Sequence, residues 1–370
     1  MKIGIDISQI IYKGTGVANY THHLVENLIK IDKTNQYILF FSSLRRKLKT
    51  SDLPFPFQKS NNVIVKKFKF PPSFLHILWN KLHVFPIEKL IGKVDVFHSS
   101  DWTQPPTSAK KITTIHDLTI IRCPESQHPQ IIKVQRSRLS RVEKEINLVL
   151  TDSESTKKDI LEFLKISPKK IKVNYLAADE IFKPEKNPSK IDKIKQKYKI
   201  KGDYILSVAT REPRKNLKKT IEAFIDLKQK NLNLVLVGKY GWGKDTNLTK
   251  NIIKTGFIPE EELPCLYSGA KVFVYPSLYE GFGLPVLESL SCGCPVVTSN
   301  TSSLPEITGD AAILVNPQNT GDISKAIYQI LYNKQLSLEL EQKGLKQAKK
   351  FSWKKTATKT IEAYEELAKC

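Results

Sequence analysis

Two neighbouring stretches, Lys271-Val-Phe-Val-Tyr-Pro-Ser277 and Glu280-Gly-Phe-Gly-Leu-Pro-Val-Leu-Glu288, decide the fold of this chain of 370 residues. The first is an apolar run that ends at a proline, which is typical of a buried strand. The second holds two glutamates separated by seven residues. Because Leu287-Glu-Ser-Leu-Ser-Cys-Gly293 indicates a short helix ended by glycine, the spacing predicts one carboxylate on the loop after a strand and the other inside the following helix.

This placement favours a particular kind of ligand. In an open α/β sheet, ligands bind where the strands end. Glu288 would lie near the positive N-terminus of its helix, where a negative charge is favoured, and the glycines after Glu280 leave backbone amides accessible. Two fixed acceptor groups around such a turn suit a ligand with many hydroxyl groups and phosphates. A nucleotide sugar is the natural candidate.

The composition is that of a globular protein with an unusual charge. Hydrophobic residues make up 40% and charged residues 26%, but 59 Lys+Arg against 37 Asp+Glu give a net charge of +22. Such a charge implies a phosphorylated partner, nucleic acid or an anionic membrane, or else a surface whose exposed positions are lysine by default. Residues 41–70 contain eight basic residues and one acid, whereas residues 271–320 contain one lysine and four acids.

Cysteine spacing and hydropathy indicate the cellular compartment and the kind of membrane contact to expect. The five cysteines have spacings that suit no zinc site, so a reduced, cytoplasmic compartment is expected. No apolar run approaches the ~20 residues needed to cross a bilayer. Met1-Lys-Ile-Gly-Ile-Asp6 is expected to be a strand rather than a signal peptide. Any membrane contact should therefore be peripheral.

Strand-like apolar runs alternate with helical patterns along the whole chain, which predicts parallel sheets with crossover helices. The pattern starts again after a polar, proline-containing stretch. We therefore expect an α/β fold of two Rossmann-like domains whose parallel sheets face a central cleft. The expected parts are a first domain at 1–182, a linker at 183–190, a second domain at 191–352, and a C-terminal helix at 353–370 that crosses back to the first domain.

Two motifs suit phosphate. Gly14-Thr-Gly16-Val-Ala-Asn-Tyr20 follows the first strand and opens a helix, so backbone amides can approach an anion. It is not the full dinucleotide fingerprint, and NAD is disfavoured. Thr210-Arg-Glu-Pro-Arg-Lys-Asn216 places Arg211, Arg214 and Lys215 on a strand-to-helix turn, which suits a diphosphate leaving group. The alternative is an exposed basic turn that Asn216 caps.

Two more motifs follow strands. His116 stands at the end of one strand, where it can hydrogen-bond a sugar hydroxyl or, equally well, pack structurally with Asp117 as its partner. Gly256-Phe-Ile-Pro-Glu-Glu-Glu-Leu263 combines a strand end, where backbone groups could hold a nucleobase edge, with a good helix N-terminus. The second motif is the weaker indication of a binding site.

Together these motifs carry a family resemblance. The block from Tyr275 to Val297, followed by Ser302-Ser-Leu-Pro-Glu306, closely resembles the donor domain of retaining GT-B glycosyltransferases of family four (group 1). The glycine loop, Thr114-Ile-His-Asp117, the basic turn, Val237-Gly238-Lys239 and Gly256-Phe-Ile258 occur in the order of that family. The stretch from Trp79 to Pro106 is most similar to bacterial mannosyl- and rhamnosyltransferases of surface polysaccharide synthesis.

The resemblance implies roles for the matched positions. Glu280 would bind donor-sugar hydroxyls, and Glu288 would hold the ribose. Arg211 or Arg214 would bind the diphosphate together with Lys215. Catalytic roles fall to Glu280, His116, Lys215 and Arg211, and donor-binding roles to Gly16, Arg214, Gly238, Phe257, Ile258, Gly281, Phe282, Gly283, Leu284 and Glu288. Many relatives have Gly-Arg where Ala209-Thr210 stands here, so the choice between the two arginines stays open.

The resemblance also implies an activity. The expected enzyme is a retaining, metal-independent hexosyltransferase without a cofactor, which moves a sugar from a nucleotide diphosphate donor to a glycan or polyprenyl-diphosphate-linked acceptor. GDP-mannose is the favoured donor, and the acceptor is expected to meet the N-terminal domain. The enzyme is expected in the cytoplasm or at the inner face of the cell membrane, without a nucleic-acid partner. The alternatives are a nucleotide-sugar epimerase, a GT-B phosphorylase, and a basic nucleic-acid-binding protein.

One apolar pattern suits a membrane. Within a helix expected at 74–91, five residues share one face: Phe74, Ile77, Leu78, Leu82 and Phe85. This face and the basic segment Arg45–Lys69 could contact anionic headgroups or a polyprenyl-diphosphate acceptor. The alternative is that the face packs on the domain core.

Overall fold

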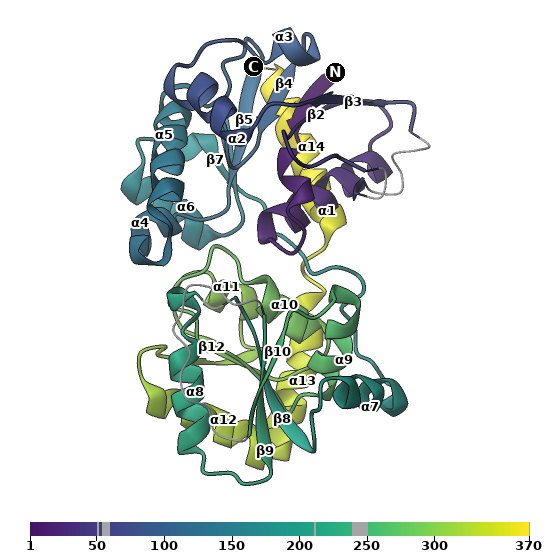
Figure 1. The fold of residues 1–370 in the computed structure, drawn as a ribbon, viewed down its shortest axis with the longest axis vertical. Helices are drawn as coiled ribbons and strands as arrows, with labels where there is room; N and C mark the ends of the chain where they lie inside the picture. The colour runs from purple at the N-terminus through teal and green to yellow at the C-terminus, as the bar shows by residue number, and fades with distance from the viewer. Residues whose placement is uncertain (50–51, 54–59, 211, 239–250, 370) are drawn as a thin grey trace. The chain divides into compact units, whose positions relative to one another are not determined.

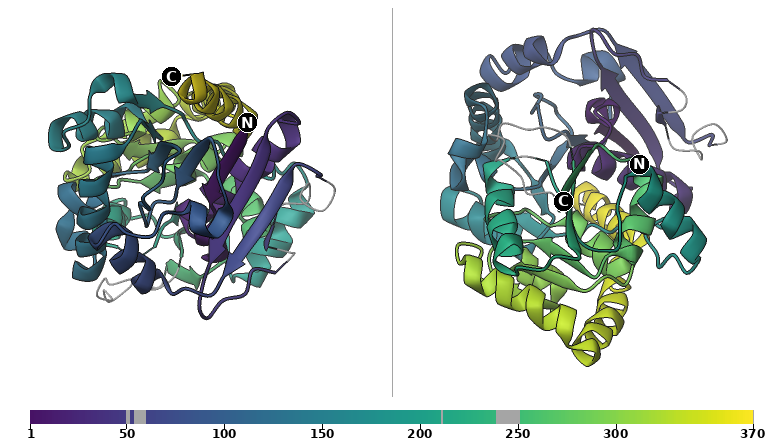
Figure 2. Two further views of the ribbon diagram at one scale, coloured as in Figure 1. Left: turned by 90° about the horizontal axis from the view of Figure 1, so that it is seen from above. Right: turned by 60° about the horizontal axis from the view of Figure 1, so that its bottom comes forward.

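The computed structural model describes residues 1–49, 52–53, 60–210, 212–238 and 251–369. These residues form two compact units, one made of 1–176 with 352–369 and the other of 177–351. Each unit is a parallel sheet covered by helices (Figures 1 and 2). The prediction of two Rossmann-like parallel-sheet domains is therefore confirmed.

The first unit has a seven-stranded sheet of order β3-β2-β1-β4-β5-β6-β7. Its strands are β1 (Lys2–Asp6), β2 (Gln36–Ser42), β3 (Val63–Phe68), β4 (Val96–Ser99), β5 (Lys110–Ile115), β6 (Leu148–Thr151) and β7 (Ile171–Val173). Its α-helices are α1 (Gly16–Ile31), α2 (Pro72–Leu75), α3 (Glu88–Ile91), α4 (Thr119–Arg122), α5 (Pro129–Glu145), α6 (Glu154–Phe163) and α14 (Trp353–Lys369). A π-helical turn, His76–Lys81, follows α2.

The second unit has a six-stranded sheet of order β10-β9-β8-β11-β12-β13. Its strands are β8 (Asp203–Val208), β9 (Leu232–Val237), β10 (Ile252–Gly256), β11 (Val272–Tyr275), β12 (Val296–Ser299) and β13 (Ala312–Val315). Its α-helices are α7 (Pro188–Lys197), α8 (Leu217–Asp226), α9 (Leu263–Gly269), α10 (Leu284–Ser291), α11 (Leu304–Thr308), α12 (Thr320–Tyr332) and α13 (Lys334–Ala348).

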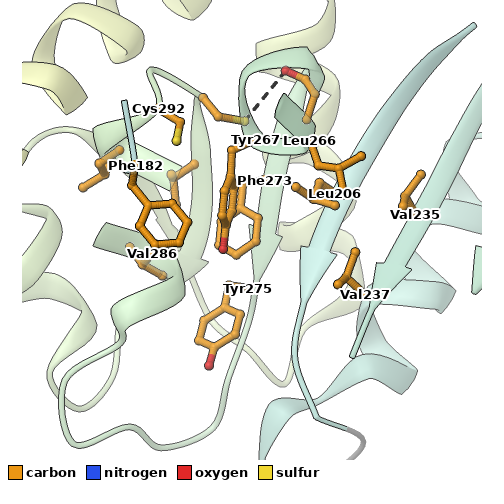
Figure 3. Close-up of a cluster of buried hydrophobic side chains, with 14 of the residues drawn as sticks. Phe182, Leu206, Val235, Val237, Leu266, Tyr267, Phe273, Tyr275, Val286 and Cys292 are labelled. Atoms are coloured by element: carbon orange, nitrogen blue, oxygen red, sulfur yellow. Dashed lines mark hydrogen bonds between the residues drawn. The ribbon is translucent and has the colours of Figure 1, made fainter. Parts of the chain in front are cut away.

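Strand β11 shows why this sheet is buried on both faces. Phe273 and Tyr275 belong to one hydrophobic cluster, while Val272 and Val274 belong to another. Because successive side chains of a strand point to opposite faces, β11 contributes to a core on each side of the sheet. Figure 3 shows the cluster that contains Phe273 and Tyr275.

The segment expected to be a linker lies within the second unit. Phe182, just before it, is buried beside Tyr267, with ring centroids 6.0 Å apart. The backbone N–H of Glu185 donates to Ser268 Oγ at 2.9 Å, and α7 begins at Pro188. The chain instead passes from one unit to the other between Leu176 and Ala177.

The prediction of a single helix at 74–91 is wrong. Helical structure ends near Leu82, and His83 and Phe85 have left-handed backbones, with φ of 55° and 66°. Pro86 disfavours the helical conformation for the residue before it. The indole Nε1 of Trp79 also donates to Phe85 O at 3.0 Å, which holds the chain in its turn.

The prediction that the C-terminal helix returns to the first domain is confirmed. Helix α14 packs against α1 (Figure 1). Inside the unit, Tyr364 Oη and His98 Nδ1 form a hydrogen bond of 2.8 Å. The amide Nδ2 of Asn174 donates to Thr360 Oγ1 at 2.9 Å. In the part of the chain that the structure describes, no helix is long and apolar enough to cross a membrane.

Replacing Thr360 by alanine should reveal how much the buried hydrogen bonds hold α14. Its hydroxyl is fully buried and accepts from Asn174. We expect Thr360→Ala to lower the free energy of unfolding by about 1–2 kcal/mol, because a buried donor loses a partner. Thr358→Ala, an identical change at an exposed position of the same helix, is the matched control. Equal denaturation midpoints for the two variants would contradict this account.

Candidate functional site

The second sheet has a topological switch point between β8 and β11. From β8 the chain continues to β9 and β10 on one side, whereas β11 lies on the other side of β8. The loops after β8 and β11 therefore lead away from each other, and such points are where open α/β sheets bind ligands. Lys215 follows β8 and Glu280 follows β11.

Glu280 is a buried carboxylate with a donor at each oxygen. Its side chain accepts from Lys215 Nζ at 2.7 Å, Tyr275 Oη at 2.9 Å and Ser277 Oγ at 2.5 Å through Oε1. Its Oε2 accepts from Arg214 Nη1 at 2.8 Å. Burial would raise the pKa of Glu280, but the charges of Arg214 and Lys215 outweigh it and lower the pKa to about 2. The group is therefore an ionised acceptor across the physiological pH range.

The basic turn is fixed to the glutamate loop by backbone contacts. The N–H of Leu278 donates to Arg214 O at 2.7 Å, and Ser277 Oγ lies 2.9 Å from the same carbonyl oxygen. Asn216 donates to Pro276 O and Pro317 O instead of capping α8. Lys215 is buried. The interpretation of this segment as an exposed turn capped by Asn216 is therefore wrong.

Two serines and a close contact hold the glycine-rich loop. The N–H of Glu280 donates to Ser302 Oγ at 3.0 Å. Ser303 Oγ donates to the carbonyls of Glu280 at 3.0 Å and Phe282 at 2.8 Å. Gly283 has φ of 102°, and a Cβ there would lie 2.7 Å from Leu304 Cδ2. Only glycine fits this position without strain. Gly281 and Phe282 are buried and Leu284 opens α10 half-buried, so Glu280 leaves β11 on a defined path.

Glu288 differs from Glu280 in its charge. It lies in the second turn of α10 and accepts from Tyr267 Oη at 2.9 Å. No cation of the described chain contributes to its pKa, which burial raises to about 8 against the effect of the Tyr267 hydrogen bond. The carboxyl group is therefore mostly protonated at neutral pH.

The remaining donor-site candidates of this unit follow β9 and β10. Gly238 has φ of 140°, and a Cβ there would lie 2.0 Å from Ala209 O, so the close approach of two strand ends requires glycine. Phe257 is exposed and Ile258 is buried in the core. These residues share the carboxyl edge of the sheet with Glu280. Arg211 lies outside the described residues.

In the first unit, His116 follows β5 and pairs with a residue that sequence reasoning missed. Its Nδ1 lies 2.6 Å from Asp152 Oδ2, whereas Asp117 Oδ1 accepts from the N–H of Thr119. The alternative that His116 packs with Asp117 as its partner is therefore wrong, because the partner is Asp152. The register of β5 and β6 opposes Ile115 to Thr151, so the next residues of both strands are neighbours. This register was the available clue to Asp152.

The surroundings of His116 favour its charged form. Burial lowers the pKa of the imidazole, but Asp152, helped by Asp101 and Asp117, raises it to about 9. His116 also lines a small cavity with Asp6 and Asp101 at the carboxyl edge of the first sheet. The Nε2–H of the imidazolium is then a charged donor, which suits an oxygen of a sugar or phosphate.

Gly16 is at the first position of α1, after Thr15, whose hydroxyl accepts from the N–H of Ala18 at 3.3 Å. A Cβ at Gly16 would meet no atom within 4 Å. Packing inside this unit therefore does not require glycine here, and the position fits a helix N-terminus that a ligand approaches closely.

Known proteins agree with this architecture. The family model "Glycosyltransferase Family 4" matches residues 14–180, and "Glycosyl transferases group 1" matches residues 190–367. The O-antigen chain mannosyltransferase B of Escherichia coli is 32% identical, over 99% of this chain and 100% of that protein. The serotype-specific mannosyltransferase WbdA of the same organism is 29% identical over 70% of this chain and 34% of its own length.

Solved structures share the fold at low sequence identity. Sucrose-phosphate synthase from Thermosynechococcus elongatus has a TM-score of 0.74 at 18% identity, covering 99% of both chains. WaaG, a glycosyltransferase involved in lipopolysaccharide biosynthesis, has a TM-score of 0.71 at 12% identity, covering 98% of this chain and 99% of its own. Two Rossmann-like domains with these sites define a glycosyltransferase of the GT-B fold. The chain belongs to glycosyltransferase family 4, also called group 1.

Changing Asp152 to asparagine should remove the charge that keeps His116 protonated. We expect the pKa of His116 to fall from about 9 by more than one unit, because burial is then opposed only by Asp101 and Asp117. NMR titration, with the signal assigned through His116→Gln, measures the shift. Asp226→Asn, at an exposed helix end, is the control.

Stability should follow the same change. The pKa of His116 is higher in the folded state, about 9, than the value of about 6.5 expected in the unfolded chain. Its ion pair with Asp152 therefore stabilises the fold fully below a pH of about 6.5, and this contribution is lost as pH rises through about 9. The stability difference between wild type and Asp152→Asn should therefore shrink across this window. An unchanged His116 titration in the variant would contradict the assignment.

Proposed function

We propose that the protein is a retaining, metal-independent mannosyltransferase that uses GDP-mannose and acts in cell-envelope polysaccharide synthesis. The observation that carries the proposal is the ionised carboxylate of Glu280, buried between Lys215 and Arg214 at the switch point. The choice of mannose is supported by the names of relatives. One is the O-antigen enzyme of E. coli, and another is the MMP alpha-(1->4)-mannosyltransferase of Mycolicibacterium hassiacum, 28% identical over 61% of this chain.

In the proposed reaction, the carboxylate of Glu280 binds the donor sugar, and the cations Arg214 and Lys215 bind the diphosphate. Glu280 accepts hydrogen bonds from donor-sugar hydroxyls, and Glu288 holds the ribose. As the bond between the anomeric carbon and the diphosphate oxygen breaks, its electron pair leaves with the diphosphate. Arg214 and Lys215, with Arg211, stabilise that charge. These side chains supply the charge that a divalent metal ion supplies in other enzymes, and this supports the metal-independent form of the proposal.

Retention is proposed to follow from attack on the same face of the sugar. The acceptor oxygen forms its bond to the anomeric carbon on the side that the diphosphate leaves, and its proton passes to a phosphate oxygen. The contacts of Glu280 support this over a covalent intermediate. Oε1 already accepts three hydrogen bonds and Oε2 an arginine, which reduces their nucleophilicity. The His116 imidazolium would meanwhile donate to the donor sugar.

The proposed acceptor is a glycan or a polyprenyl-diphosphate-linked sugar bound by the N-terminal domain. One relative, from Campylobacter jejuni, carries the name of a transferase acting on a diphospho-undecaprenol-linked sugar and is 28% identical over 60% of this chain. The basic residues of segment 41–70 support an anionic acceptor. We propose a cytoplasmic enzyme that meets such an acceptor at the inner face of the cell membrane.

The two glutamates should affect different steps. Glu288→Ala should weaken nucleotide binding, measured by titration calorimetry with GDP, by about tenfold or more, because a buried hydrogen-bonding group is lost. Glu280→Ala should lower turnover of GDP-mannose at least about 100-fold, the range for a group acting in the transition state, and should affect GDP affinity less than turnover.

A thermal-shift panel of nucleotide diphosphates and their sugars tests the donor. GDP and GDP-mannose should stabilise the wild type most. Stabilisation only by UDP or dTDP compounds would refute the donor choice. A trapped glycosyl adduct on Glu280 would refute same-face attack.

Nucleotide affinity should depend on pH through Glu288. Because its pKa is about 8 without ligand, accepting two ribose hydroxyls as a carboxylate requires loss of a proton. GDP affinity should then rise by up to about tenfold per pH unit between pH 6 and 8 and level off above 8. The phosphates of GDP titrate in the same way with Glu288→Gln, but this variant has no carboxyl proton to lose. The pH profile of GDP affinity for Glu288→Gln is therefore the baseline. Affinity that falls with pH relative to this baseline would show that the neutral acid binds the ribose.

A further inference from the structure

Large apolar side chains are exposed in the first unit from α2, through the π-helical turn, to the chain before α3. Five of the sixteen large hydrophobic residues that the described chain exposes lie within residues 74–85. They are Phe74 at 44%, Ile77 at 47%, Leu82 at 62%, Val84 at 48% and Phe85 at 43% exposed, and we call them the apolar rim. Exposed clusters of this kind mark interaction sites rather than ordinary surface.

The rim is held in place by contacts beneath it. Leu75 and Trp79 are buried in the core, and Leu78 packs against it. The Nδ1–H of His83 donates to Trp79 O at 3.0 Å, and its Nε2 lies 2.9 Å from Glu145 Oε2. The left-handed backbones of His83 and Phe85 are costly for residues other than glycine. Such strain persists only where the surroundings impose it, and here it keeps apolar side chains exposed.

Positive charge surrounds the rim. Lys81 and Lys89 are exposed within the same segment. Helix α5 packs against the π-helical turn, where Arg141 donates to Asn80 O at 3.0 Å and Lys81 O at 2.5 Å. Lys133 of α5 is close enough, with Lys81, to add to the lowering of the pKa of His76.

The acids of the region are already engaged. Glu145 is bound by His83 and Lys111. Glu88 accepts from Thr107 and Ser108. These neutral donors leave Glu88 its negative charge, but the exposed Lys81, Lys89 and Lys133 outnumber it, so the charge of these groups together is positive.

A row of aromatic rings joins the rim to the basic edge strand β3. Phe68 stacks on Phe70 at 6.0 Å, and Phe70 packs on Phe74 at 5.5 Å. Strand β3 is the edge of its sheet, and its exposed lysines are Lys66 and Lys67, with Lys69 just beyond its end. Through these rings the apolar rim adjoins the strand that carries Lys66 and Lys67.

We infer that the apolar rim and its lysines dock the protein on an anionic phospholipid bilayer. The apolar side chains enter the boundary between headgroups and acyl chains, and the lysines bind the anionic headgroups. A second copy of this chain is a poor occupant, because it would bring like charges together on a protein of net charge +22. The inference goes beyond the proposed function, although a lipid-linked acceptor would give such docking a purpose.

Flotation of the full chain with vesicles tests this inference. The wild type should float with phosphatidylcholine vesicles that contain phosphatidylglycerol, weakly with phosphatidylcholine alone, and less as salt rises. Leu82→Gln/Phe85→Asn should lower the bound fraction about tenfold or more. The asparagine keeps a residue that tolerates the left-handed backbone. Lys66→Gln/Lys69→Gln should weaken binding only to the anionic vesicles.

The matched control removes two exposed apolar side chains elsewhere. Tyr332→Gln/Leu338→Asn, on α12 and α13, changes residues of similar exposure and should float like the wild type. Absence of wild-type flotation, equal loss in this control, or equal binding to neutral vesicles would overturn the inference. So would a dimer, seen by sedimentation, that the Leu82→Gln/Phe85→Asn change dissociates without affecting flotation.

GDP-induced thermal stabilisation, measured without vesicles, separates the two proposals. It should be unchanged in all four proteins, which also shows that the variants fold. Retained stabilisation without flotation would refute docking alone. Flotation without stabilisation by any nucleotide would refute the proposed activity alone.

Discussion

The ion cluster of Glu280, Lys215 and Arg214 constrains the whole second unit. Taking an unpaired carboxylate out of water costs several kcal/mol, so Glu280 can be buried and ionised only while both cations stay in place. This requires the loops after β8 and β11 to be held at a fixed separation, which the contacts of Leu278 and Ser277 with Arg214 O achieve. The parallel order of the sheet, with β8 beside β11, is what makes these contacts available.

The first unit uses the opposite charge arrangement at the same edge of its sheet. There a cation, the His116 imidazolium, is held by the carboxylate of Asp152. The buried Arg138 and the half-buried Asp101 form a second ion pair, at 3.2 Å. One unit thus presents a fixed anion between cations and the other a fixed cation among anions. Each unit orients its own charged group through these pairs before any ligand binds.

Local patterns were enough to predict the parts of the site that lie on single loops. The glutamate spacing, the prolines and Gly293 place Glu280 on a loop and Glu288 in a helix, as the structure does. The partners of these groups depend on register between strands that are distant in sequence, which periodicity does not encode. Asp152 was missed for that reason. The sequence places Tyr275 and Ser277 in or beside a strand. That their hydroxyls donate to Glu280 follows only from the path of the chain after β11.

The segment 74–91 shows the opposite failure, because its local pattern predicts one continuous helix, whereas the structure interrupts the helix after Lys81 and starts a new one at Glu88. Apolar residues at helical spacing predict one buried or bound face, yet Trp79 and Leu75 enter the core while Phe74, Ile77, Leu82 and Phe85 stay exposed. Contacts with Phe85 O and Glu145 bend the chain where its hydropathy alone would continue a helix.

Exposing five large apolar groups on a strained turn opposes stability, and burying them against the core would be favourable by roughly 1.5–3 kcal/mol for each. The fold instead secures the turn through Trp79, His83 and Arg141 and leaves the apolar groups in water. Local conflicts with the rules of stable packing are expected where a surface serves binding. The conflict here lies in a segment that also exposes Lys81 and Lys89, and apolar side chains beside lysines suit an anionic lipid surface.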